Sequence, residues 1–275
     1  IENSTGRILS FVGGRDFELS EVNHATQAYR HLGSSIKPLL VYAPAIEYGV
    51  IGAGSPVVDV KFTSKGWSPS NYIASYEAGI IPARQALAMS LNVATVRLYY
   101  DILERRPMEF LHKMGFSRLT ETDYTVPSAA LGAVDGSVEE NTNAFATLGN
   151  GGKYAKSYMI ERIEDKEGNI IYQHEVNPVE VFSPETAYIV TDMLKGVLYG
   201  NGTAPAVTGQ MNFRPDMAAK TGTSNDFADS WLVGYTPNVS LGVWFGYKDK
   251  IVENGVKRNL AQRSGAHPTT RVSGL

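Results

Sequence analysis

The sequence predicts an α+β fold, in which a central antiparallel β-sheet is flanked by helices. Two observations carry this prediction. Strand-like apolar segments lie near both ends of the chain, at residues 8–12 and between residues 217 and 247. Most of the segments between them have the periodicity of helices. Strands at both ends with helices between them are typical of an antiparallel sheet that carries helices on its faces.

The N-terminal part of the chain predicts a strand and then a helix. The turn sequence Asn3-Ser4-Thr5-Gly6 precedes the strand at residues 8–12, which stops at Gly13-Gly14. Residues 33–42 predict a helix, because Pro38 lies near its start, where the N–H groups have no intrahelical acceptor. This helix places Ser34 at its N-terminus, where backbone donors favour developing negative charge.

The remaining elements follow from periodicity and from turn residues. Residues 52–70 are rich in Gly, Ser, Pro and Thr and predict a long loop or a small irregular insert. The next helical pattern breaks at Ser90, so Ser90 and Asn92 are expected on a turn between two helices. Further helices are predicted at residues 82–89, 92–103, 108–114, 143–148 and 184–198. Strands are predicted as a hairpin at 160–163 and 170–172, and as sheet segments at 217–223, 231–235 and 239–247.

Composition excludes several classes of function. A formal net charge of -3 argues against a nucleic-acid partner and against a polybasic membrane surface. The absence of cysteine excludes disulfides, cysteine nucleophiles and thiolate metal sites. The five histidines show no metal-binding spacing, so we expect no metal and no cofactor. There is no apolar stretch of about 18 residues and no signal peptide, so any membrane anchor of a parent protein would lie outside this sequence.

Three short motifs predict a serine acyl-transfer site without histidine. They are Ser34-Ser35-Ile36-Lys37, Ser90-Leu91-Asn92 and Lys220-Thr221-Gly222-Thr223. A hydroxyl needs a base before it can attack a carbonyl, and a neutral lysine three residues further along a helix can serve. Ser34 and Lys37 would share one helix face, whereas Ser35 would lie on another, so Ser34 is the expected nucleophile.

The order of the motifs carries more information than any single one. A Ser-x-x-Lys match arises roughly once by chance in a chain of this length, and Lys-Thr-Gly-Thr in about one chain in a hundred. Lys37 must also be neutral to act as a base, which requires its pKa to fall about three units from its ordinary value. Burial and a second cation both act in that direction, and Lys220 is the candidate for the cation.

With their flanking residues, these motifs resemble the transpeptidase domain of class A penicillin-binding proteins, over most of the chain from Ser4 to about Asp249. Two departures are His31-Leu32, where Gln-Pro is expected, and Ala94, where proline is expected. A C-terminal helix expected on the sheet has no counterpart after Arg258. The matching segments are Phe11-Val12-Gly13-Gly14-Arg15-Asp16-Phe17, Ala25-Thr26-Gln27-Ala28, Gly33-Ser34-Ser35-Ile36-Lys37-Pro38, Gln85-Ala86-Leu87-Ala88-Met89-Ser90-Leu91-Asn92-Val93, Pro127-Ser128-Ala129-Ala130-Leu131-Gly132, Asn150-Gly151-Gly152, Ala218-Ala219-Lys220-Thr221-Gly222-Thr223 and Val233-Gly234-Tyr235-Thr236-Pro237.

The resemblance implies catalytic roles for Ser34, Lys37, Ser90, Asn92 and Lys220. Ser34 would attack the penultimate D-alanine of a D-Ala-D-Ala stem peptide and form an acyl-enzyme, with Lys37 or a serine relay as the base. Ser90 would relay a proton to the leaving amine. Asn92 would bind the substrate amide and Lys37, and Lys220 would complete the catalytic set.

The third motif is also expected to bind substrate. Its strand can pair with the extended substrate peptide, and Gly222 would let the two backbones approach closely. The hydroxyls of Thr221 and Thr223 would bind the carboxylate of the substrate or the antibiotic. The N–H groups of Ser34 and Thr223 would form an oxyanion hole.

The resemblance also implies a domain organisation and partners. We expect a transpeptidase domain at residues 1–250, with an all-helical subdomain inserted at about residues 40–180, and a polar tail at residues 251–275. The expected partners are peptidoglycan stem peptides and β-lactam antibiotics. The parent chain would carry a glycosyltransferase domain and a membrane anchor absent here, and would lie on the outer face of the cytoplasmic membrane, whereas this fragment is expected to be soluble.

Three alternative functions stay open at this point. A serine β-lactamase shares the motif types, but the chain lacks the Glu-x-x-Leu-Asn segment that activates water in class A lactamases. A D,D-carboxypeptidase differs only in using water as acceptor, which leaves no short motif. A non-catalytic β-lactam sensor would keep Ser-x-x-Lys and Lys-Thr-Gly, and the class A flanking segments argue against it.

Overall fold

A computed structural model of the chain describes residues 1–16, 18, 21–224, 227–246, 252–253 and 256–257. Its central sheet has three antiparallel strands in the order β11-β10-β9, with bounds Ser240–Gly246, Asp229–Tyr235 and Ala218–Thr223. In its register, Leu232 of β10 lies opposite Thr221 of β9 and Val243 of β11. The three predicted C-terminal strands and their antiparallel pairing are therefore confirmed, although Tyr247, the predicted end of the last strand, lies outside the described residues.

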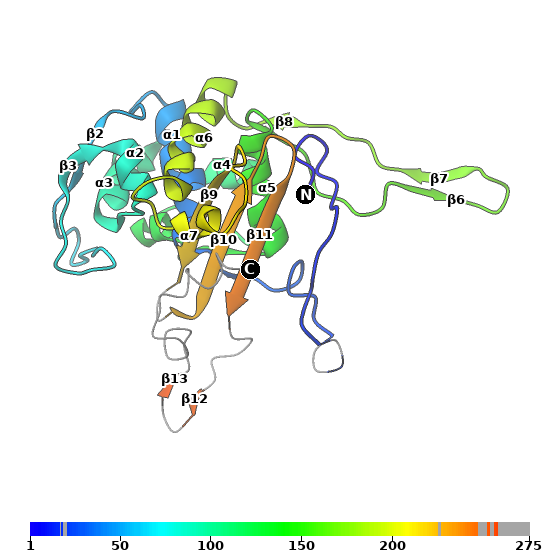
Figure 1. Cartoon of the computed structure of the whole chain (residues 1–275), viewed down its shortest axis with the longest axis horizontal. Coiled ribbons are helices and arrows are strands. Elements are labelled where there is room, and N and C mark those ends of the chain that lie inside the picture. The colour runs from blue at the N-terminus through cyan, green and yellow to red at the C-terminus, as the bar shows by residue number, and fades with distance from the viewer. Residues whose placement is uncertain (17, 19–20, 225–226, 247–251, 254–255, 258–275) are drawn as a thin grey trace.

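Helices cover this sheet and build the rest of the body (Figure 1). The long helix α6 (Pro184–Leu198) contacts β9, and α5 (Val138–Gly149) contacts β10 and β11. Trp231 and Val233 of β10 are buried in the core beneath them. The remaining helical segments are η1 (Gly33–Ile36), η2 (Pro38–Tyr42), α1 (Ala43–Glu47), α2 (Ala83–Ala88), α3 (Asn92–Ile102), η3 (Leu103–Arg105), α4 (Met108–Lys113), η4 (Pro127–Leu131) and α7 (Pro205–Gly209).

The predicted helices are confirmed, with small changes at their ends. The segment predicted at residues 33–42 is a continuous helical run that changes from a 3-10 turn in η1 to a π turn in η2 and then to α1. Pro38 and Pro44 cannot donate backbone hydrogen bonds, which disfavours regular α-helical pairing there. Helix α5 begins five residues earlier than predicted, because Ser137 and Glu140 form a capping box at its N-terminus.

Short strands pair in twos outside the central sheet. β1 (Arg30–His31) pairs with β4 (Asp135–Gly136), and β5 (Lys153–Tyr154) pairs with β8 (Val179–Glu180). The predicted hairpin is confirmed as β6 (Arg162–Glu164) and β7 (Ile170–Gln173), which extend away from the body (Figure 1). The segment at residues 40–180 contains strands as well as helices, so the prediction that it is all-helical is wrong. Its status as a separate subdomain stays a prediction.

The predicted strand at residues 8–12 is not formed. The segment runs along the surface, where the side chains of Leu9, Phe11 and Val12 are exposed. At its start the Ile8 N–H donates a hydrogen bond to the Tyr158 carbonyl. Strand-like periodicity is not sufficient, because a strand also needs a neighbour with which to pair. Within the described residues, no strand pairs with residues 8–12.

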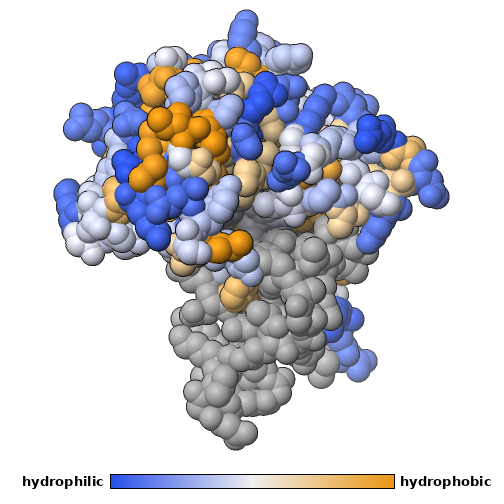
Figure 2. All heavy atoms as spheres, turned by 60° about the vertical axis from the view of Figure 1, so that its left-hand side comes forward, coloured by the Kyte–Doolittle hydropathy of each residue, from blue (hydrophilic) through white to orange (hydrophobic). Residues whose placement is uncertain are grey.

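The predicted irregular insert at residues 52–70 contains a strand that sequence analysis missed. β2 (Pro56–Asp59) pairs with β3 (Gly79–Pro82). The pair lies beside α2 and α3 at the edge of the molecule (Figure 1). Val58 and Ile80 expose apolar side chains there, and Figure 2 shows this side of the molecule, with several hydrophobic residues grouped on a mainly hydrophilic surface. The sequence Pro56-Val57-Val58-Asp59 does not alternate between apolar and polar residues, because the charged Asp59 takes an inward position, so it gave no strand signal within the Gly- and Ser-rich sequence around it.

Most of the predicted polar tail lies outside the described residues. Within residues 251–275 the structure describes only β12 (Val252–Glu253) and β13 (Val256–Lys257), which pair with each other. Of the helices that the structure describes, none combines the length and the apolar character needed to cross a bilayer.

Candidate active site

Ser34 lies on η1, where that turn packs against the end of β9. Gly33, directly before it, has a φ of +53°, a conformation that favours glycine. A Cβ on Gly33 would lie 2.5 Å from the Thr223 carbonyl oxygen and 2.9 Å from the Thr223 nitrogen. Glycine at this position therefore allows the backbone of β9 to approach the residue next to Ser34.

The two neighbouring serines have different surroundings. The Ser35 hydroxyl is buried, donates to the Leu32 carbonyl at 2.8 Å and accepts from the Asn141 amide at 3.0 Å. Ser34 is half-buried, and its hydroxyl has no hydrogen-bond partner among the described residues. Ser35 is thus committed to packing, whereas the Ser34 hydroxyl is available for a ligand.

Lys37 is completely buried and points to the Ser90-Leu91-Asn92 turn. Its Nζ donates to the Ser90 carbonyl at 2.7 Å and to Asn92 Oδ1 at 2.6 Å, and it lies 3.3 Å from Ser90 Oγ. A neutral lysine has two N–H groups and one lone pair. The first two contacts satisfy both N–H groups, which leaves the lone pair for a hydroxyl such as Ser90 or Ser34.

Lys220 contacts the Ser90 hydroxyl from the strand β9, whereas Lys37 contacts it from the helical run at residues 33–42. It lies on β9, is completely buried, and donates to Ser90 Oγ at 2.8 Å and to the Thr221 carbonyl at 3.0 Å. Ser90 adopts a φ of +58°, unusual for a residue with a side chain, at the tight turn between α2 and α3. The predicted turn is confirmed, and it brings one hydroxyl between two lysines.

The electrostatics of the two lysines follow from their burial. Neither lysine forms an ion pair with another described residue, and a buried ammonium without a carboxylate is strongly disfavoured. Burial, and then the charge of Lys220, hold the pKa of Lys37 well below 10.5, while the Asp59 carboxylate acts in the opposite direction. Burial lowers the pKa of Lys220 to about 7. The site therefore favours the neutral amine at both lysines more strongly than water does.

The other residues of the third motif are divided between the two faces of β9. The Thr221 hydroxyl is buried and shares a hydrogen bond of 2.6 Å with Thr203 Oγ1. A Cβ on Gly222 would lie 2.7 Å from the Leu32 carbonyl oxygen and 2.9 Å from the Ser35 nitrogen. The close approach that Gly222 permits is therefore to η1 of the same chain, a role that sequence analysis did not predict for it. Thr223 is half-buried beside Gly33.

Sequence comparison identifies the family. The family profile described as penicillin binding protein transpeptidase domain matches residues 1–248. The chain belongs to this family. Its transpeptidase domain is 32% identical over 249 residues to penicillin-binding protein 4 of Bacillus subtilis and 33% identical over 267 residues to penicillin-binding protein 1A of Clostridium tetani. Each alignment covers 90% of this chain but only 39% and 33% of the relatives, so the chain spans about a third to two fifths of their length.

Solved structures agree with this assignment. Penicillin-binding protein 1A from Haemophilus influenzae superposes with a TM-score of 0.79 and 26% identity, over 90% of this chain and 42% of that chain. PonA1 from Mycobacterium tuberculosis in complex with penicillin V superposes with a TM-score of 0.74 and 25% identity, over 90% and 67% of the two chains. The α+β transpeptidase fold predicted from the sequence is thereby confirmed.

The structure of the transpeptidase domain adds polar residues near the site that sequence analysis missed. Asp59 and Asn71 are buried behind the Ser90–Asn92 turn, and Thr203 bonds to Thr221. The Ser70 carbonyl accepts from the Asn92 amide at 2.8 Å, which orients that amide so that its oxygen faces Lys37. An inward position on the alternating strand β2 was a signal for Asp59, but it required recognition of the strand. Asn71 and Thr203 lie on loops and carry no comparable signal.

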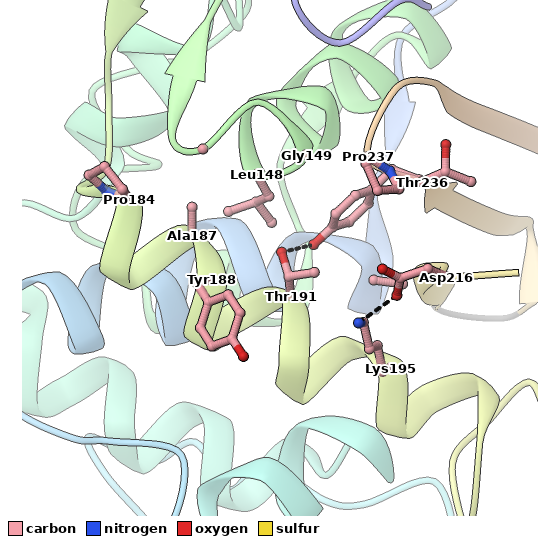
Figure 3. Close-up of a pocket in the computed structure, with 13 residues that line it drawn as sticks. Leu148, Gly149, Pro184, Ala187, Tyr188, Thr191, Lys195, Asp216, Thr236 and Pro237 are labelled. Carbon is pink, nitrogen blue, oxygen red and sulfur yellow. Dashed lines mark hydrogen bonds and ion pairs between the residues drawn. The ribbon is translucent and has the colours of Figure 1, made fainter.

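A cavity of about 310 Å³ lies elsewhere in the transpeptidase domain (Figure 3). Helix α6 contributes Ala187, Tyr188 and Thr191, while Ala218 and Tyr235 come from the sheet. Lys195 and Asp216 form an ion pair of 2.5 Å at its edge (Figure 3). Ala218 is the first residue of β9, whereas Thr223 near Ser34 is the last, so this cavity lies at the other end of the strand. It contains none of the predicted site residues.

Proposed function

We propose that the chain is a D,D-transpeptidase domain that forms an acyl-enzyme on Ser34 with D-Ala-D-Ala stem peptides and transfers the acyl group to an amine. The observation that carries the proposal is the pair of buried lysines that share the Ser90 hydroxyl. Lys37 of this pair follows Ser34 by three residues on the same helical run, and the Ser34 hydroxyl has no hydrogen-bond partner among the described residues. Such a site would supply a neutral amine to a free hydroxyl, which is the requirement for a serine nucleophile without histidine.

In acylation, Ser34 Oγ attacks the carbonyl carbon of the penultimate D-alanine and Lys37 Nζ takes the hydroxyl proton. The tetrahedral intermediate collapses when the C–N bond to the last D-alanine breaks. That amine must receive a proton to leave. The contacts of Ser90 with Lys37 and Lys220 support a relay in which Ser90 gives its proton to the leaving amine and recovers one from a lysine.

In deacylation, the amine of a neighbouring stem peptide attacks the ester carbonyl and Ser34 leaves as the alcohol. The attacking amine loses one proton, and Ser34 regains one, so the same groups can work in reverse. A β-lactam would follow the first half of this course through opening of its ring. The acyl group would then stay on Ser34.

The surroundings of Ser34 support the proposed binding of substrate. Among the strands that the structure describes, β9 pairs with β10 alone, so its other edge can pair with an extended peptide. The packing of Thr223 against Gly33 supports an oxyanion hole formed by the N–H groups of Ser34 and Thr223. If Thr203 donates to Thr221, then the Thr221 hydroxyl can donate its own hydrogen to a substrate carboxylate. The Thr223 hydroxyl would bind the same carboxylate. Asn92 would bind the substrate amide, provided that its contact with Lys37 loosens.

The greater length of the relatives supports a larger parent protein. We propose that it carries a glycosyltransferase domain and a membrane anchor, and that it works on the outer face of the cytoplasmic membrane on lipid-linked or polymerised peptidoglycan. The residues described here would supply the transpeptidase half of that protein.

The test is to incubate the chain with a penicillin and to follow its intact mass over time. We expect one stable adduct that Ser34→Ala abolishes. Absence of any adduct would contradict the acyl-enzyme proposal. Rapid loss of the adduct with turnover of the drug would indicate a β-lactamase.

A second assay uses a D-Ala-D-Ala peptide with and without an acceptor amine. Cross-linked product supports the transpeptidase. Release of D-alanine to water alone would indicate a carboxypeptidase, and no release from a chain that forms the penicillin adduct would indicate a sensor.

A further inference from the structure

The buried carboxylate of Asp59 lies behind the Ser90–Asn92 turn and takes no part in the proposed chemistry. Asp59 ends β2, in which Val57 and Asp59 point inward while Val58 points outward. Its side chain is completely buried, and it forms no ion pair with any residue that the structure describes. A buried carboxylate without a cation is costly unless hydrogen bonds satisfy it.

Three donors satisfy this carboxylate. Oδ1 accepts from the Ala94 N–H at 3.1 Å, and Oδ2 accepts from the Ala78 N–H at 2.9 Å and from the Asn71 amide at 2.8 Å. Asn71 is only 5% exposed, and its own Oδ1 accepts from the N–H groups of Asn92 at 2.8 Å and Val93 at 3.3 Å.

Asp59 and Asn71 therefore supply the acceptors that the N-terminus of α3 lacks locally. Leu91 precedes the helix, and its apolar side chain cannot cap it. The first three N–H groups of α3, at Asn92, Val93 and Ala94, bond instead to side chains more than twenty residues away in sequence. A carboxylate at this end of a helix is also favoured by the helix dipole. The cap holds Asn92, whose side chain receives Lys37.

We propose that Asp59 and Asn71 are positioning residues of the active site, which hold the Ser90–Asn92 turn against Lys37 by capping α3 from the side of β2. The inference rests on the proposed function, because it takes Lys37 as the base. Asp59 also acts through its charge. Within the described part of the chain, Asp59 on β2 and Lys220 on β9 are the charged groups that act on Lys37, and Asp59 raises its pKa while Lys220 lowers it.

The test measures the rate of acylation by a fluorescent penicillin between pH 5 and pH 10 in the whole chain and in Asp59→Asn. The amide cannot accept from all three donors, so we expect the rate on the alkaline plateau to fall at least about tenfold. Loss of the negative charge also lowers the pKa of Lys37 further. Because acylation needs the neutral amine, its acid limb should move to lower pH, by about half a unit or more.

Two further variants separate positioning from a general loss of structure. Asn71→Asp places a second carboxylate beside Asp59 and should acylate slowly. The double variant D59N/N71D restores one amide–carboxylate hydrogen bond in the reverse direction and keeps an acceptor for the Asn92 N–H. We expect it to acylate at least about fivefold faster than Asn71→Asp. Asp165→Asn is the control, since Asp165 also accepts from backbone N–H groups, but on the distant β6–β7 hairpin (Figure 1).

The outcomes are distinct. A slower Asp59→Asn with a shifted acid limb, together with rescue in the double variant, supports the inference. A slower Asp59→Asn whose acid limb does not move, or a rate equal to that of Asp165→Asn, overturns it. If Asp59→Asn fails to fold, the comparison of Asn71→Asp with the double variant decides in the same way. If the unmodified chain forms no adduct at all, the proposed function itself fails and the inference falls with it.

Discussion

Lys37 and Lys220 share the hydroxyl of one serine, since Ser90 Oγ lies 3.3 Å from the first amine and 2.8 Å from the second. Both lysines are completely buried, and neither has an ion-pair partner among the described residues. Two ammonium groups in such a place repel each other and lack solvation, so the protons of the pair are held weakly. The following predictions concern this pair and the elements that hold it.

Ser35→Ala should remain an acylating enzyme. Its hydroxyl donates to the Leu32 carbonyl and accepts from Asn141, so its loss should lower the free energy of unfolding by about 1–2 kcal/mol. Acylation by penicillin should stay within a few-fold. Ser34→Ala is the matched control and should do the opposite, with unchanged stability in denaturant and no adduct by mass. An adduct on Ser34→Ala that is missing in Ser35→Ala would exchange the two assignments.

Asn92→Asp should shift the pH profile of acylation upward. Asn92 Oδ1 lies 2.6 Å from Lys37 Nζ, and a carboxylate there favours the ammonium and raises the pKa of Lys37. Because the proposed reaction needs the neutral amine, the acid limb should move to higher pH by about one unit or more. Asn150→Asp, at the end of α5, is the control. An unchanged limb in Asn92→Asp would show that Lys37 is not the group that titrates.

Lys220→Met should change how stability depends on pH. The pKa of Lys220 is about 7 in the folded chain and about 10.5 when unfolded, so the unfolded chain binds the extra proton between these values. Stability should therefore rise with pH across this window in the parent chain. We expect Lys220→Met to be the more stable at pH 7, by on the order of a few kcal/mol, and to lose most of that advantage by pH 10.

Urea unfolding at the two pH values checks the Lys220→Met prediction. Lys166→Met, at an exposed lysine in the turn of the β6–β7 hairpin, serves as control and should show no such change between the two. An equal difference between Lys220→Met and the parent at pH 7 and pH 10 would contradict the prediction.

Gly33→Ala should disturb the site as well as the fold. A new Cβ would need to lie 2.5 Å from the Thr223 carbonyl oxygen, so η1 and β9 must separate. We expect acylation to slow at least about tenfold and stability to fall by more than the 1–2 kcal/mol that a positive φ alone costs. Gly66→Ala is a matched control, because its φ is +79° and its Cβ would meet no atom within 4 Å. Similar losses in both variants, measured by penicillin binding and thermal unfolding, would exclude the close approach as the cause.

Much of the fold was accessible from the sequence because its signals are local. The bounds of α6 were predicted to the residue, and the strands β9 to β11 within two residues at either end where they are described. The turn at Ser90 was predicted from a break in helical periodicity. The sequence-based predictions failed where the local pattern of residues did not match the strand pairing of the folded chain. Residues 8–12 have the pattern of a strand without a neighbour, and β2 is a strand inside a loop-like sequence.

The sequence by itself determined which residues are proposed for the site, since Ser34, Lys37, Ser90, Asn92 and Lys220 could be named from their motifs. What only the tertiary structure decided is the state of those groups. Lys37 contacts a serine 53 residues away, and Lys220 contacts the same serine from 130 residues away. The desolvation and repulsion that weaken proton binding at Lys37 depend on these approaches, and so does the cap on α3 from Asp59 and Asn71. Such effects depend on distances in space, which residue order does not encode locally.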